Sequence, residues 1–188
     1  MFIQTEITPN PNTLKFFPGS VVMKSGTMDF NNAEEASKSY LAQALFAIKD
    51  VKGVFFGYDF ISVTKEESAD WAILKPEILM TIMSHFVDGR SLFIDQDSAT
   101  GEDEQDEDYD EADSELVAQI KELIETRVRP AVAQDGGDII FRGYRDGVVT
   151  LKLQGACSGC PSSTLTLKDG IENMLRYYIP QVELVEAA

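Results

Sequence analysis

Cysteine and histidine are scarce in this chain: 188 residues include two cysteines, Cys157 and Cys160, and one histidine, His85. Two cysteines so close together would close too short a loop to serve as a disulfide framework. A structural zinc site needs four ligands, and one chain offers at most these three. We expect His85 on the surface of a helix rather than at a metal. The scarcity favours a reducing compartment and a chemical role for the cysteine pair.

Long apolar runs and basic segments are also missing. No run approaches the roughly 18 residues of a membrane helix. Met1 leads directly into FIQTEI, without a cationic, apolar or Arg/Ser-rich leader, which favours a bacterial cytoplasm over a mitochondrial matrix reached with a leader since removed. No segment supplies a basic patch for phosphates. We therefore expect neither a membrane nor a nucleic acid as a partner.

Acidic residues are concentrated in one tract. The net charge is −16, with 13 acidic and 8 basic residues in 1–101, 9 and none in 102–113, and 10 and 8 in 114–188. The tract EDEQDEDYDEAD repels itself and has almost nothing to bury. We expect 99–113 to be a disordered acidic linker between two small domains, 1–98 and 114–188.

The first half has the pattern of a small α/β domain. FIQTEI and LKFF read as strands, and VFFGYDFISV reads as two strands joined tightly. Helical spacing begins at Ala33, where Asn31 or Asn32 could cap the helix. A second helical segment follows Asp70 and is interrupted at Pro76, which suits the first turn of a new helix.

The second half predicts the order α-β-β-α-β, so the whole chain falls in the α+β or α/β class. A helix ends before Pro130, and DIIFRGY and VVTLKL flank a hairpin turn at Arg145-Asp146-Gly147. The DGGD stretch, 135–138, is expected to be a structural turn from helix to strand. A second helix ends before Pro180 and precedes a short strand, VELV. The two cysteines lie on the loop before that second helix.

The cysteine loop, GACSGCPSS, has features that favour thiolates. Pro161 suits the first turn of a helix that Ser162 or Ser163 could cap. The positive end of that helix would then lie near Cys160 and Cys157, and such an end lowers the pKa of a thiol. We expect the loop to present both thiolates outward.

Three kinds of site fit a lone Cys-x-x-Cys pair: a redox dithiol, half of a zinc site and half of an iron–sulfur cluster site. Thioredoxin-type dithiols usually follow the first strand of a βαβ unit, whereas this pair follows a hairpin. A cluster needs about four thiolates, so one chain falls two short. Two chains together supply four, which would make cluster binding depend on dimerisation.

The run VRPAVAQDGGDIIFRGYRDGVVTLKLQGACSGCPSSTLTLKDGIENMLRYYIPQV resembles the C-terminal NifU-like domain of iron–sulfur cluster scaffold proteins. TPNPNTLKFFPG, LAQALFAIKDVKGVFFG and ISVTKE resemble the N-terminal domain of the Nfu branch. The resemblance implies that Cys157 and Cys160 are cluster ligands and that two protomers share one [4Fe-4S] cluster for delivery to apo-proteins. It implies a carrier rather than an enzyme, loaded by upstream assembly machinery, with an N-terminal domain that recognises partners. The alternatives are a thiol–disulfide oxidoreductase and a zinc-stabilised interaction module.

Overall fold

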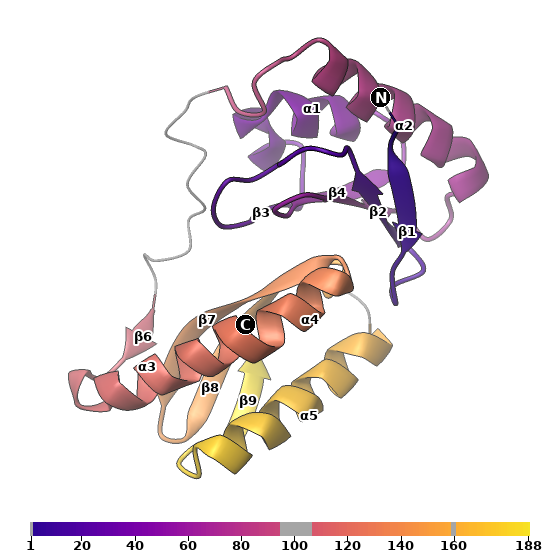
Figure 1. The fold of residues 1–188 in the computed structure, drawn as a ribbon. Helices are drawn as coiled ribbons and strands as arrows, with labels where there is room; N and C mark the ends of the chain where they lie inside the picture. The colour runs from indigo at the N-terminus through magenta and orange to yellow at the C-terminus, as the bar shows by residue number, and fades with distance from the viewer. Residues whose placement is uncertain (1, 95–106, 159–160) are drawn as a thin grey trace. The chain divides into compact units, whose positions relative to one another are not determined.

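The computed structural model describes residues 2–94, 107–158 and 161–188. The chain divides into two compact units, Met1–Glu102 and Asp103–Ala188, and each combines a sheet with helices (Figure 1). The expected class, two small domains that mix helices and strands, is confirmed. In the described parts of the chain, no helix is long and apolar enough to cross a membrane.

The N-terminal unit contains an antiparallel five-stranded sheet in the order β1-β2-β5-β4-β3. The tight β4–β5 hairpin confirms the two strands expected in VFFGYDFISV, whereas β3 was not expected. Buried aromatic and branched side chains on one face form the core with helices α1 and α2. The strands are β1 (Gln4–Ile7), β2 (Thr13–Phe17), β3 (Met28–Phe30), β4 (Val51–Phe56) and β5 (Ile61–Lys65).

The first helix of this unit begins later than the sequence suggested. A 3-10 turn, η1 (Glu35–Lys38), precedes α1 (Tyr40–Phe46). The Asn32 side chain accepts a hydrogen bond from the Glu35 amide at 2.9 Å, at the start of this 3-10 turn and not of α1. The extended backbone of Ser39 interrupts the helical path, and its hydroxyl accepts from the Ala42 amide at 3.2 Å, which starts α1.

Helix α2 (Trp71–Val87) runs through Pro76 without a break, so the expected interruption there is wrong. Asp70 caps the helix, accepting a hydrogen bond from the Ala72 amide at 2.9 Å. Proline at position 76 removes the N–H that would bond to the Ala72 carbonyl. Because Ala72 is exposed, water can serve that carbonyl instead, and the loss is tolerated.

His85 lies inside the N-terminal unit, not on its surface as expected. Its side chain is 7% exposed, and its ring meets Phe86 edge-on at 5.5 Å between centroids. Burial lowers the pKa of His85, and the nearby Arg90 lowers it further, while Asp88 acts in the opposite direction. The side chains of α2 that face the core are Leu74, Ile78, Ile82 and His85.

The C-terminal unit has a four-stranded sheet in the order β6-β7-β8-β9. A long antiparallel hairpin, β7–β8, forms its centre, and β6 and β9 add in parallel at either side. Asp146 and Gly147 take φ values of 49° and 83° at the hairpin turn, as expected for that dipeptide. The strands are β6 (Asp108–Tyr109), β7 (Gly137–Arg145), β8 (Val148–Gly155) and β9 (Leu184–Ala187).

The helix before the hairpin continues past Pro130, so its expected end there is wrong. It consists of α3 (Ser114–Leu123), a π-helical segment η4 (Ile124–Val128) and α4 (Arg129–Gln134). Pro130 lies in the first turn of α4, where a missing N–H costs little. The wider π turn relieves the clash that proline makes with the preceding turn in a regular helix.

The end of the acidic tract is ordered, so the expectation of a disordered linker is wrong for 107–113. Asp108 and Tyr109 form β6 beside Gly143 and Tyr144 of β7. Two short ion pairs, Lys121–Glu107 and Arg145–Asp108, each at 2.6 Å, offset the local negative charge. The remainder of the expected linker, 99–106, lies outside the described residues.

Candidate functional site

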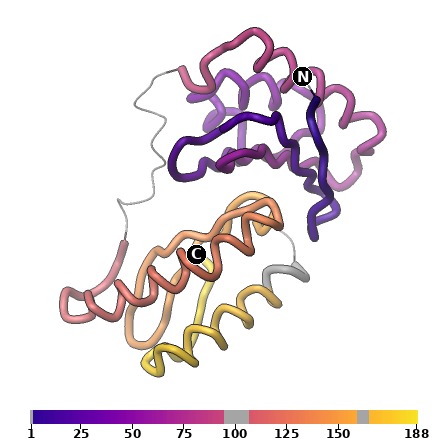
Figure 2. Tube along the Cα trace, in the orientation of Figure 1, coloured from indigo at the N-terminus to yellow at the C-terminus, as the bar shows by residue number. Residues whose placement is uncertain are grey.

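The cysteine loop lies in the sequence between β8, orange in Figure 2, and α5 (Pro161–Tyr178), yellow in the same view. Helix α5 begins at Pro161, as expected. Ser162 and Ser163 fall within this helix rather than before it, so neither can be its N-cap. Cys160 lies outside the described residues, and the predicted pairing of its thiol with that of Cys157 stays a prediction.

Cys157 points into the C-terminal unit. It is 5% exposed and belongs to the buried apolar cluster of that unit, so the expectation of an outward thiolate is wrong for this residue. Gly155, at φ 63°, turns the chain, and the Ser158 amide then donates to the Gly155 carbonyl at 3.1 Å. The Ala156 amide donates to the Gly136 carbonyl at 3.1 Å. These bonds hold Cys157 over the start of β7.

Gly137 provides the space in which Cys157 lies. A Cβ at position 137 would sit 2.9 Å from the Cys157 sulfur, 3.1 Å from its amide nitrogen and 2.4 Å from the Gln154 carbonyl oxygen. The separations of 2.4 and 2.9 Å are shorter than a Cβ atom tolerates, so a larger residue here would displace the strand or the loop. Gly136, at φ 85°, makes the turn out of α4, as expected for the DGGD stretch.

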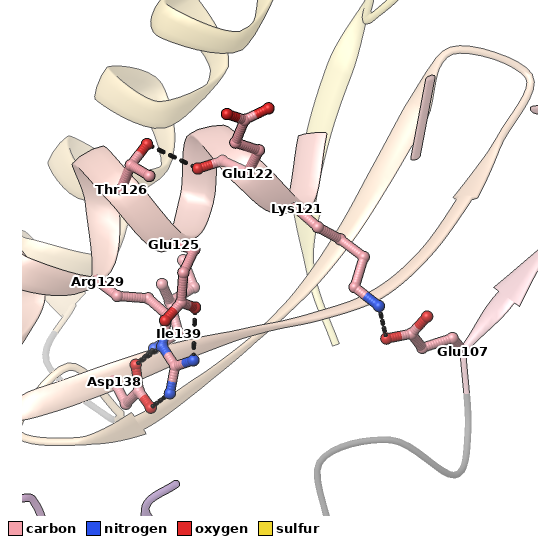
Figure 3. A network of polar contacts seen from close by, with 8 residues as sticks. All are labelled: Glu107, Lys121, Glu122, Glu125, Thr126, Arg129, Asp138 and Ile139. Carbon is pink, nitrogen blue, oxygen red and sulfur yellow. Dashed lines mark hydrogen bonds and ion pairs between the residues drawn. The ribbon is translucent and has the colours of Figure 1, made fainter. Parts of the chain in front are cut away.

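Asp138, the next residue, anchors this strand to the helix before it. Its two carboxylate oxygens accept hydrogen bonds from Nε and Nη2 of Arg129 at 2.8 and 2.6 Å (Figure 3). One oxygen also accepts from the Ile139 amide at 2.8 Å. The Glu125 carboxylate accepts a hydrogen bond from Nη1 of the same guanidinium at 2.7 Å. Residues on α4 and η4 therefore fix the strand that lies beneath Cys157.

The Arg129–Asp138 pair is largely removed from water. The Asp138 side chain is 4% exposed and that of Arg129 is 28% exposed. Hydrogen bonding to Asp138 raises the pKa of Arg129 above its already high value, so the guanidinium stays charged. The sequence pattern did not predict this pair. The available signal was the aspartate near the start of an apolar strand, nine residues after an arginine on the preceding helix.

No group of three or more His, Cys, Asp and Glu side chains able to hold a metal ion occurs among the described residues. His85, which the sequence offered as a third candidate ligand beside the two cysteines, is buried in the N-terminal unit.

Both halves of the chain match known domain families. Residues 3–89 match the family described as the N-terminal domain of the scaffold protein Nfu/NifU, and residues 120–186 match the NifU-like domain. The chain belongs to the Nfu/NifU family. Its NifU-like half holds the hairpin, Gly137 and Cys157 described above.

Relatives of this Nfu-type chain align along nearly its whole length. The human "NFU1 iron-sulfur cluster scaffold homolog, mitochondrial" is 55% identical over 187 residues, which are 99% of this chain and 71% of the human protein. "NifU-like protein 4, mitochondrial" of Arabidopsis thaliana is 52% identical over 188 residues, 99% of this chain and 65% of the plant protein. The chain thus spans about two thirds of the plant relative.

A NifU-like protein of Saccharomyces cerevisiae, solved in solution, is 27% identical with a TM-score of 0.46, covering 51% of this chain and 87% of the yeast chain.

Proposed function

We propose that this chain is an iron–sulfur cluster scaffold and carrier, with Cys157 and Cys160 as its cluster ligands. The observation that carries the proposal is the built environment of Cys157: a sulfur seated on Gly137, in a NifU-like domain whose relatives are named cluster scaffolds. These are the two cysteines of the chain, so no other thiolate could serve.

The cargo is a [4Fe-4S] cluster shared between two protomers. Such a cluster is ligated by about four thiolates, and each chain contains two cysteines. Release to an apo-protein then proceeds by exchange, as each thiolate of the target replaces one thiolate of the carrier. The chain acts as a carrier and not as an enzyme, because no substrate bond is remade.

Loading has to change the surroundings of Cys157. Cys157 is 5% exposed, so the residue has little contact with solvent. The loop has to lift away from Gly137 or the side chain has to adopt another rotamer before a cluster can bind. The bonds that hold the loop, such as the one from the Ala156 amide to the Gly136 carbonyl, are amide hydrogen bonds worth about 1 kcal/mol each, so each adds little to the cost of this opening.

The partners are apo iron–sulfur proteins as recipients and an assembly machinery as the donor, with the N-terminal unit recognising them. The human and Arabidopsis relatives are named mitochondrial, which supports the mitochondrial matrix. The bacterial cytoplasm, favoured by the sequence alone, finds no support in these relatives.

Anaerobic reconstitution tests the proposal. Protein incubated with iron and sulfide should turn brown, sediment as a dimer and carry about four irons and four sulfides per dimer. Cys157→Ser and Cys160→Ser should each abolish this, while Ser158→Ala, between the two cysteines, should not.

Three results would contradict it: iron held tightly by a strict monomer, iron kept by the double serine variant, or a colourless monomer. In the last case, catalytic disulfide reduction would favour an oxidoreductase. Stoichiometric zinc whose removal unfolds the protein would favour a zinc-stabilised interaction module.

A further inference from the structure

Helix α2 carries a stripe of apolar side chains on its exposed side. Ile73, Met80 and Val87 are 72%, 70% and 67% exposed, and Met83 is 39% exposed. Pro76 is exposed as well. With intervals of three and four residues, these five side chains follow the a and d positions of a heptad repeat along one side of the helix. We call them the α2 stripe.

The α2 stripe is unusual for a helix at a surface. The opposite side of α2 already packs on the core, so the helix is apolar nearly all round, a pattern that is typical of helices covered on both sides. Helix α3 shows the ordinary arrangement, because its exposed positions are mainly polar and include Glu115, Gln119 and Lys121. Exposed apolar side chains gathered along one side of a helix commonly mark a binding site.

The geometry of the stripe fits a helix. The side chains of a helix spaced at a and d pack into the grooves of another helix at a shallow crossing angle. An added β-strand is a poor fit, because the backbone of α2 is engaged in its own helical hydrogen bonds. Two methionines, Met80 and Met83, lie in the middle of the stripe, and their flexible side chains adapt to differing partners.

Charge determines which helix fits. Glu77 is exposed and lies next to Ile73 and Met80 on the helical wheel, and Asp70 lies on the same flank at the N-terminal end. Lys75, half-buried, lies on the far side. An occupant with lysine or arginine beside its apolar face would meet this acidic flank. A second copy brings the same carboxylates and a net charge of −16, and an anionic membrane is repelled for the same reason.

We propose that the α2 stripe binds an amphipathic helix of a partner protein that carries basic residues beside its apolar face. The proposal deepens the recognition role assigned above to the N-terminal unit, and it rests on the proposed function only for the biological identity of the partner.

The test uses the full chain with both cysteines replaced by serine, so that cluster binding plays no part in the outcome. The probe is a fluorescent helical peptide of about three heptads, with leucine at a and d and lysine at the flanking positions. The control peptide has the same sequence with glutamate in place of lysine. Affinity is measured by anisotropy, and the contact site by the methyl signals of Ile73, Met80 and Met83 in nuclear magnetic resonance spectra.

The lysine peptide should bind and shift these methyl signals. The glutamate peptide should bind about tenfold or more weakly at low salt, and the difference should shrink as salt is added. Met80→Glu and the uncharged Met80→Gln should each weaken binding of the lysine peptide by about tenfold or more. Ile7→Glu, which alters a side chain on β1 that is 87% exposed, should leave binding unchanged.

Equal affinity for the two peptides, shifts confined to methyl groups outside α2, or equal losses in the Met80 and Ile7 variants would overturn the proposal. Self-association in sedimentation that Met80→Glu abolishes would replace it with a second copy as the occupant. Binding to vesicles of anionic lipid, abolished by the same variant, would replace it with a membrane surface.

Discussion

Replacing Arg129 with glutamine tests whether the anchor beneath the cysteine loop stabilises the C-terminal unit. The change removes the guanidinium that binds both oxygens of Asp138 at 2.6 and 2.8 Å. The Asp138 carboxylate, 4% exposed, would then keep only its bond from the Ile139 amide and other local contacts. The variant therefore leaves a nearly buried charge without its countercharge.

Breaking a buried ion pair by removing one partner costs about 3–5 kcal/mol. Because the Arg129 side chain is 28% exposed, water can reach part of the vacated site, and we expect about 2–3 kcal/mol. Domains of this size are stable by about 5–15 kcal/mol, so the loss is large enough to measure and small enough to leave the fold intact.

The assay is urea unfolding followed by far-ultraviolet circular dichroism, with Trp71 fluorescence recorded in parallel. Trp71 is the single tryptophan and lies in α2, so its signal reports on the N-terminal unit and serves as an internal reference. Arg145→Gln is the matched control, because Arg145 and Asp108 form a pair at 2.6 Å whose side chains are 61% and 74% exposed. We expect that control to change stability by less than about 1 kcal/mol.

Equal losses in the two arginine variants would refute the reasoning, since burial would then make no difference to the value of the pair. An Arg129→Gln variant whose free energy of unfolding equals that of the unaltered protein would refute the reasoning as well.

Three further outcomes follow from the structure. Gly137→Ala should destabilise the C-terminal unit by about 1–3 kcal/mol in urea unfolding, whereas Gly170→Ala, with nothing within 4 Å of its added Cβ, should be neutral or mildly stabilising; equal effects would contradict the close approach to Cys157. In a Cys160→Ser chain, Cys157 should react with a thiol reagent at least about tenfold more slowly than in urea, and equal rates would show an exposed sulfur. The imidazole of His85, the single histidine, should titrate below its usual value of about 6.5. The folded state therefore binds this proton less readily than the unfolded state, so the N-terminal unit should gain stability as pH rises toward neutrality and level off above about 6.5; His85→Gln should remove this contribution.

Local chemistry made several elements predictable. The Asp146-Gly147 turn was readable because both residues must take positive φ, and few residue types do so readily. Apolar periodicity likewise identified α3 and α5. The two prolines misled for a common reason: proline restricts only its own turn, and exposure at Ala72 and a π segment before Pro130 allowed both helices to continue.

The site itself depended on contacts between distant residues. Spacing singled out Cys157 but could not show that it lies over Gly137, because that contact joins the two ends of a hairpin. The acidic tract was read from its composition, yet Lys121 and Arg145, both outside it, order its final residues. His85 looked like a surface residue because a histidine, unlike its apolar neighbours, gives no burial signal in a helical pattern.

The Asp138 carboxylate also serves the backbone of its own strand. The Ile139 amide is buried and lies outside the part of β7, Gly143 and Tyr144, that pairs with β6. A buried amide without an acceptor costs free energy comparable to a lost hydrogen bond. Asp138 accepts from this amide at 2.8 Å. Loss of the carboxylate would therefore deprive two donors of an acceptor at once, the Ile139 amide and the guanidinium of Arg129.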